Sequence, residues 1–301
     1  MRTRLYSPVL SGHPTLFLAL LLIVLGCLGV AQAAPVSQAT QGRLDMSDWD
    51  LSQRLSWNLT GDWEFYWGQL LGPEDFAQAQ PPTPTAYFPV PGSWIKYRLN
   101  GKSLPSDGYA TYRLLIDALP DQPLALRVPY MSSAYKLWIN GQLIASNGQV
   151  GTSRASETPQ YKPLVVDVPP GFTQVELVLQ ISNFHHYRGG MRYPIVIGDK
   201  DSIYKFERIE LSLIAFLIGC LIFISLYHVL FFALQRKDRS SYYFGIFAFF
   251  VVVRLLFVGP ILLVRIFPDY NWEIALKIEY ITTALLIMIC NLRVSHLGTM
   301  L

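Results

Sequence analysis

The chain has 301 residues, a formal net charge of +3 and only 15% charged residues, with a mean hydropathy of +0.30. Soluble domains usually carry about 25% charged residues, so part of this chain must be strongly apolar. The small net charge, without a basic run interleaved with aromatics, argues against a nucleic-acid partner. The three cysteines, Cys27, Cys220 and Cys290, lie in apolar stretches, which excludes disulfides and cysteine zinc sites from the polar middle of the chain.

The first 33 residues have the pattern of a secretory signal peptide. Two arginines in the first four residues precede an apolar run over 16–25, and Ala-Gln-Ala ends at Ala33. The run is too short to cross a bilayer core of about 30 Å, so we predict cleavage after Ala33. Two alternatives are a lipoprotein modified at Cys27 and an uncleaved membrane anchor.

Residues 34–54 are predicted to be a linker, and residues 55–200 an extracytoplasmic β-sandwich. Residues 175–182 alternate apolar and polar side chains with a period of two, and Asn140-Gly141 is a strong β-hairpin turn. Short strands separated by turns, without interleaved helices, are typical of an antiparallel sandwich. Strands are predicted at 110–119, 124–130, 134–140, 164–168, 175–182 and 193–198, with a short helix at 73–78.

A partial membrane bundle is predicted at 208–292, followed by a tail at 293–301. Residues 211–235 contain no Asp, Glu, Lys or Arg, and a helix of this length reaches about 37 Å, which suffices to span. The second and third spans are predicted at 242–264 and 272–292. Export of the sandwich makes the first span run inward, so the basic residues 236–239 lie in the cytoplasm. We therefore expect a bacterial inner-membrane protein, in contact with the lipid bilayer, whose β domain lies in the periplasm.

Arg254 stands inside the second predicted span. A cation at the centre of a membrane helix costs at least about 2.5 kcal/mol. We expect Arg254 to face the bundle interior, with a partner on a span that this chain lacks; snorkelling to an interface is the alternative.

No nucleotide-binding, metalloprotease or serine-hydrolase motif occurs, so the sequence predicts no enzyme, catalytic residue or cofactor. The loop over 182–192 gathers polar, aromatic and cationic side chains around two glycines, which suits either ligand binding or a solvated hairpin connection. Its candidate ligand-binding residues are His185, His186, Arg188 and Arg192. Neighbouring histidines on a strand point to opposite faces, so no metal site is predicted. Trp94 could stack on a sugar ring, although a buried core position suits it better.

Several phrases resemble one family: 61–67, 90–94, 108–113, 133–141 and 182–183. In this order they resemble the galactose-binding-like jelly-roll domain of bacterial seven-transmembrane receptors with diverse intracellular signalling modules. The sandwich domain of glycoside hydrolases shares the Pro-Gly-Ser-Trp and Asn-Gly elements. The resemblance implies an all-β jelly-roll sandwich followed by a transmembrane α-helical region, and it adds Arg113 to the candidate ligand-binding residues.

The resemblance also implies a receptor whose outer domain senses a carbohydrate or other small molecule. The bundle would pass the signal to a cytoplasmic effector, and a homodimer suits such a receptor. The family has seven spans and an effector, whereas three spans are counted here, so we expect a truncated or frameshifted fragment or a natural short form. The alternatives are a membrane-anchored carbohydrate-binding module linked to an enzyme, and a scaffold whose sandwich binds another protein.

Overall fold

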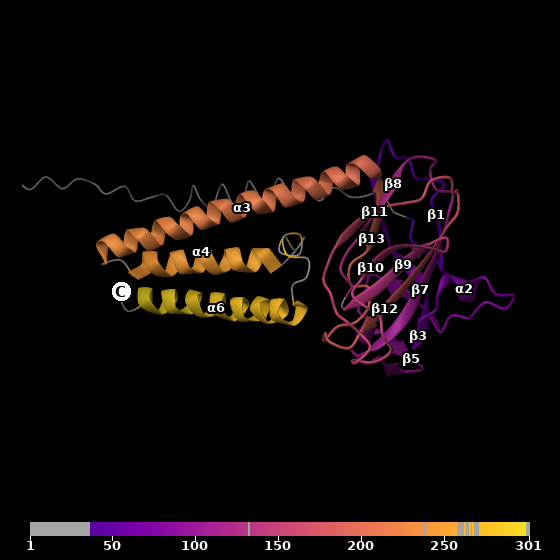
Figure 1. Cartoon of the computed structure of the whole chain (residues 1–301), viewed down its shortest axis with the longest axis horizontal. Helices are drawn as coiled ribbons and strands as arrows, with labels where there is room; N and C mark the ends of the chain where they lie inside the picture. Colours follow the sequence, from indigo (N-terminus) through magenta and orange to yellow (C-terminus); the bar gives the residue numbers. More distant parts are fainter. Residues whose placement is uncertain are drawn as a thin grey trace, which may run out of the picture. The chain divides into compact units, whose positions relative to one another are not determined.

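The computed structural model describes residues 37–131, 133–236, 239–257 and 271–298, together with 262, 265 and 267. The predicted signal peptide and its cleavage site, Cys27 and the last three residues lie outside the described residues. Figure 1 shows a β-rich part followed by helices in chain order.

Two sheets, antiparallel except for the pairing of β1 with β7, form the β-rich part, which confirms the predicted sandwich. The larger sheet has the strand order β10-β9-β12-β7-β3-β4, with β1 added on β7, and the smaller has the order β11-β8-β13-β2. The larger sheet consists of β1 (Arg43–Asp45), β3 (Gly61–Trp67), β4 (Ala86–Val90), β7 (Gly108–Asp117), β9 (Ala134–Ile139), β10 (Gln142–Asn147) and β12 (Val175–Asn183). The smaller consists of β2 (Ser56–Leu59), β8 (Leu124–Val128), β11 (Leu164–Asp167) and β13 (Ile195–Asp199).

Three short elements lie outside these sheets. They are α2 (Pro73–Phe76), the 3₁₀ helix η1 (Trp94–Lys96) and a small hairpin of β5 (Arg98–Leu99) and β6 (Lys102–Ser103). The helix α2 falls within the short helix predicted at 73–78.

The core lies between the two sheets and is rich in aromatic side chains. Phe65 of β3 and Tyr112 of β7 are fully buried, with ring centroids 4.9 Å apart. Alternation in β12 predicted one buried face, but the structure buries Val178 on the other face as well. The reason is a second small cluster, in which Phe76 of α2 and Tyr66 cover Val178.

The sheet begins earlier in the chain than the predicted boundary at residue 55. Within the predicted linker, β1 pairs in parallel with β7, and Leu44 lies opposite Ile116. Three residues are too few for an alternating pattern to reveal, so the strand was missed. The hairpin turn between β9 and β10 is confirmed, because both Asn140 (φ 45°) and Gly141 (φ 84°) have positive φ.

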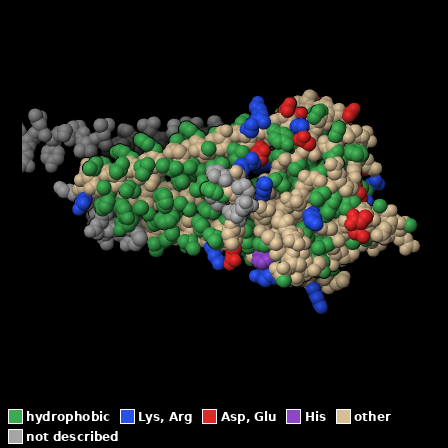
Figure 2. Space-filling model, in the orientation of Figure 1, with side chains coloured by type: hydrophobic (Ala, Val, Ile, Leu, Met, Phe, Trp, Pro, Cys, Tyr) green, Lys and Arg blue, Asp and Glu red, His purple; other side chains and the backbone are tan. Residues whose placement is uncertain are grey.

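Three long helices follow: α3 (Lys200–Gln235), α4 (Arg239–Phe257) and α6 (Trp272–Gly298). α4 packs against both α3 and α6. Among the described residues, α3 is the one helix long and apolar enough to cross a membrane, and α4 contains a shorter apolar stretch, Ser241–Phe257. Figure 2 shows hydrophobic side chains spread over the visible face of the helical region. α6 continues beyond residue 292 into the predicted tail.

Candidate functional site at the junction of sandwich and helices

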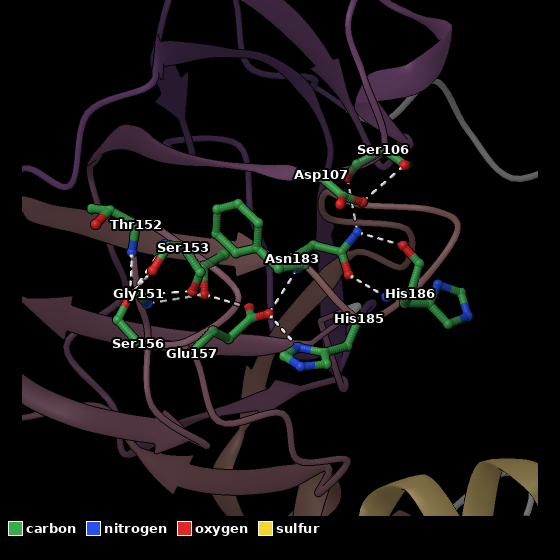
Figure 3. A network of polar contacts seen from close by, with 12 residues as sticks. Ser106, Asp107, Gly151, Thr152, Ser153, Ser156, Glu157, Asn183, His185 and His186 are labelled. Atoms are coloured by element: carbon green, nitrogen blue, oxygen red, sulfur yellow. Dashed lines mark hydrogen bonds and ion pairs between the residues drawn. The ribbon is translucent and has the colours of Figure 1, made fainter.

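The predicted ligand-binding loop is held by a buried carboxylate, that of Glu157 (Figure 3). The Glu157 side chain is fully buried and accepts hydrogen bonds from Ser182 Oγ (2.6 Å) and the Phe184 backbone N (2.7 Å). His185 Nδ1 lies 2.9 Å from the second Glu157 oxygen. A buried carboxylate needs such partners, so Glu157 fixes where the loop leaves β12.

Asn183 closes the base of the same loop. Its Nδ2 donates to the backbone oxygens of His186 (2.7 Å) and Ser106 (2.8 Å), and its Oδ1 accepts from the His186 backbone N (3.1 Å). These three hydrogen bonds join the loop base to the end of β12 and to Ser106, as Figure 3 shows.

Trp94 is fully buried, and it supports the other end of the loop. Its Nε1 donates to Ser106 O (3.0 Å), and its backbone N donates to Gly189 O (3.1 Å). Gly189 leaves no room for a side chain, since an added Cβ would lie 2.0 Å from Trp94 Cζ2. Trp94 is thus a packing residue that is closed to a ligand.

Arg113 is half-buried on the outer face of the larger sheet. Its Nε bonds Glu176 (2.6 Å), its Nη1 bonds Glu64 (3.0 Å), and its guanidinium lies 4.8 Å from the centre of the Phe76 ring. None of these partners belongs to the 182–192 loop. The structure therefore does not bring Arg113 together with the other predicted site residues.

The remaining predicted residues form an aromatic and cationic cluster. His186 is buried, and burial lowers the pKa of its imidazole. Arg188 is exposed and lies over the Tyr187 ring (4.9 Å). Arg192 is half-buried, and its guanidinium carbon lies 5.8 Å from the centre of the Tyr130 ring and 5.7 Å from that of the Tyr193 ring. The two rings therefore stabilise the charge of Arg192 through cation–π contacts.

The same loop contacts the start of α6. The Trp272 indole is buried and lies edge-on to the rings of Tyr161 (5.4 Å between centroids) and His185 (6.1 Å). The loop therefore contacts a membrane-region helix instead of ending in solvent, a contact that the local sequence pattern did not predict.

The most direct connection between sandwich and helices is the junction of β13 and α3. The strand ends at Asp199 and the helix begins at Lys200, without a linker. The Asp199 carboxylate accepts a hydrogen bond from Ser202 N (2.9 Å), as an N-cap does. Lys200 N donates to Pro123 O (3.0 Å). The first turn of α3 is therefore built onto the smaller sheet.

Side chains of α3 extend this attachment over three turns. Lys200 Nζ bonds Asp167 Oδ2 of β11 (2.6 Å), and Tyr204 donates to Asp167 Oδ1 (3.2 Å). Farther along, Glu210 accepts from Arg127 of β8 (2.6 Å). α3 has 36 residues, or about 54 Å, whereas a bilayer core is about 30 Å thick. The extra length accounts for the turns that pack on the sandwich.

Residues 210–295 match the family model described as 7TM diverse intracellular signalling. The resemblance to that receptor family is confirmed. The match lies in the helical region, and the family is one of receptors and not of enzymes. Together with the span-length helix α3, it makes the chain a membrane protein.

The sandwich is similar in part to solved glycosidase structures. An uncultured Clostridium sp. beta-glucuronidase aligns with a TM-score of 0.37 and 16% identity, over 49% of this chain and 30% of that chain. A Ruminococcus gnavus beta-glucuronidase aligns with a TM-score of 0.35 and 18% identity, over 48% of this chain and 28% of that chain. An Eisenbergiella tayi GH2 beta-galacturonidase aligns with a TM-score of 0.34 and 16% identity, over 48% of this chain and 25% of that chain. The chain thus spans less than a third of each of these enzymes. No curated protein matches the chain.

Within the receptor-family region, Arg254 has its partners on a helix of this same chain. Its Nη1 donates to the backbone oxygen of Glu279 (3.3 Å) and to Thr283 Oγ1, both on α6. The prediction that the partner of Arg254 lies on a span outside this chain is therefore wrong, because α6 supplies two oxygens to its guanidinium. Among the described residues, no group of three or more His, Cys, Asp or Glu could hold a metal ion.

Proposed function

We propose that this chain is the sensing part of a membrane receptor, in which the sandwich binds a small ligand and α3 carries the response towards the membrane. The observation that carries the proposal is the direct continuation of β13 into α3, capped by Asp199 and fastened by Lys200, Tyr204 and Glu210. In this proposal the strand and the helix move together, because no linker separates them and these contacts fasten the helix to the sheet. A change in the smaller sheet then shifts or tilts the helix.

The proposed orientation follows from the predicted signal peptide. The sandwich lies in the periplasm, α3 crosses the inner membrane inward, and Arg236 at its end faces the cytoplasm. The exposed apolar side chains along α3, such as Phe216 (72% exposed) and Leu234 (86%), contact lipid or further helices in this arrangement. Protease added to spheroplasts should cleave within the sandwich without prior lysis; protection of the sandwich until lysis would contradict the orientation.

Ligand binding is tested with the whole chain in lipid nanodiscs. The probes are neutral sugars, amino acids and nucleosides, and the readout is the Tm of the sandwich from tryptophan fluorescence. We expect at least one class to raise the Tm in a concentration-dependent way, since a ligand of the folded state stabilises it by mass action. A Tm that none of the three classes changes would contradict sensing of a small molecule.

The alternative of an anchored binding module makes a different prediction. A module that only holds a ligand would show protection at the ligand site and none farther along α3. Amide hydrogen exchange over 205–210, measured with and without the stabilising probe, separates the two functions. Slower exchange in that segment supports the receptor.

A further inference from the structure

A second region, away from the 182–192 loop, has the form of a binding site. It is an open cavity of about 910 Å³, within the size range of small-molecule sites. Its walls are the β7–β8 connection (119–123), the start of β10 (142–144), and the end of β11 with the turn that follows (166–172). Lys200 and Tyr204 of α3 complete the lining. We call this cavity the junction pocket.

The polar groups of the junction pocket are accessible to a ligand. The Lys200 and Asp167 side chains that form the ion pair are 41% and 49% exposed. This pair offers an ammonium donor beside a carboxylate acceptor. Two neighbouring hydroxyl groups of a ligand would match this donor and this acceptor, because one can accept a hydrogen bond from Lys200 while the other donates to Asp167. Asp121 adds a second carboxylate to the lining, which disfavours an anionic ligand.

Beside these polar groups, the pocket also has exposed apolar side chains that suit the apolar faces of a ligand. Phe172 (45% exposed) and Leu143 (50% exposed) present large apolar side chains to solvent. Exposed apolar groups beside polar ones are typical of ligand sites. An aromatic ring can cover the C–H face of a sugar while polar groups bind its edge.

From these contacts we infer that the junction pocket is the sensor site, and that it takes an uncharged polyhydroxylated ligand of sugar size. The inference rests on the proposed function and gives it a location. A ligand that bridges Lys200 and Asp167 alters the contact that fastens the first turn of α3 to β11. The binding event and the membrane helix then share two residues, Lys200 and Tyr204. No relay through the sheet is needed.

The test uses the whole chain in nanodiscs and titrates glucose, galactose, mannose, maltose and cellobiose by saturation-transfer NMR. Phe172→Ala and Asp167→Asn alter exposed side chains, so the core remains intact. Tyr187→Ala (56% exposed) and Arg188→Ala in the 182–192 loop are the matched controls. We expect each pocket variant to raise the apparent Kd about tenfold, the loss expected for one stacking or charge-assisted contact. The controls should bind as the wild type does.

The possible failures are distinguishable. Sugar binding that the pocket variants leave unchanged, and that a loop variant weakens, would overturn the junction pocket and leave the proposed function in place. Binding of a small amine such as putrescine, with no sugar bound, would overturn the ligand class. If no sugar and no amine binds to the wild type, the junction pocket is overturned as a sugar site, and the proposed function then stands or falls on the amino acids and nucleosides of the Tm test.

Discussion

The carboxylate of Asp199, the last residue of β13, accepts a hydrogen bond of 2.9 Å from the backbone N of Ser202 in α3. One side chain therefore ends a strand of the sandwich and caps the helix that enters the membrane. The first backbone N–H groups of a helix have no partner within the helix. Asp199 satisfies one of them at the point where the two parts of the chain meet.

Replacing Asp199 should loosen this junction. Asp199→Ala removes the cap and should lower the free energy of unfolding by about 1 kcal/mol, with faster amide exchange in the first turn of α3. Asp199→Asn is the matched control, because asparagine caps about as well. Hydrogen exchange followed by mass spectrometry measures the exchange rate of the first turn of α3 in both variants. Equal exchange in wild type and Asp199→Ala would show that the cap does not hold the turn.

Glu157 should be essential for the stability of the 182–192 loop. Glu157→Gln places an amide donor against groups that donate to the carboxylate, Ser182 Oγ and Phe184 N. A buried mismatch of this kind should lower the free energy of unfolding by at least about 2 kcal/mol. Thermal unfolding by near-UV circular dichroism measures the loss. Asp48→Asn, at an exposed position, is the control and should leave the Tm unchanged.

Gly189 should not tolerate a side chain. A Cβ at this position would overlap Trp94, which is fully buried and cannot move aside. Gly189→Ala should therefore destabilise the sandwich by about 1–3 kcal/mol. Gly219→Ala in α3 meets no atom within 4 Å and should have little effect. The Tm values of the two variants give the comparison, and equal values would contradict the tight packing of the loop against Trp94.

Acidification should weaken the sandwich through His186. Burial holds the pKa of His186 below its ordinary value of 6.5, so the unfolded chain binds more protons between the folded pKa and about pH 6.5. The free energy of unfolding therefore rises with pH in that window, and stability is lost as the pH falls below about 6.5. His186→Gln should flatten this dependence. Denaturant unfolding between pH 5 and 7.5 provides the measurement, and an unchanged slope would show that the pKa of His186 is the same in the folded and the unfolded chain.

Patterns with a strong local cause were predictable from the sequence. An uncharged run long enough to cross a bilayer predicts α3, and Asn140-Gly141 predicts its hairpin because the turn needs two residues with positive φ. The role of Trp94 could not be predicted in this way. The sequence allowed either stacking on a ligand or packing in the core, and only the fold shows that Gly189 lies against the Trp94 ring.

The junction was beyond sequence reasoning for a related reason. The first turn of α3 is charged, so hydropathy placed the start of the span at residue 211, eleven residues after the helix begins at Lys200. Asp167 and Lys200 are 33 residues apart in the chain. Their pairing depends on how β11 and β13 flank β8 in the smaller sheet. The site residues predicted from the loop therefore did not include those of the junction pocket.

Joint movement of α3 and the sandwich is tested most directly by amide exchange over residues 205–210, which do not line the junction pocket, in nanodiscs with the stabilising sugar. A variant with Gly-Ser-Gly-Ser inserted between Tyr204 and Lys205 keeps Lys200 and Tyr204 in the pocket and serves as the uncoupled control. We expect the ligand to slow exchange in 205–210 of the wild type, and the insertion to abolish this change while the sugar still raises the Tm of the sandwich. Exchange in 205–210 that does not respond to the bound sugar in the wild type would contradict joint movement.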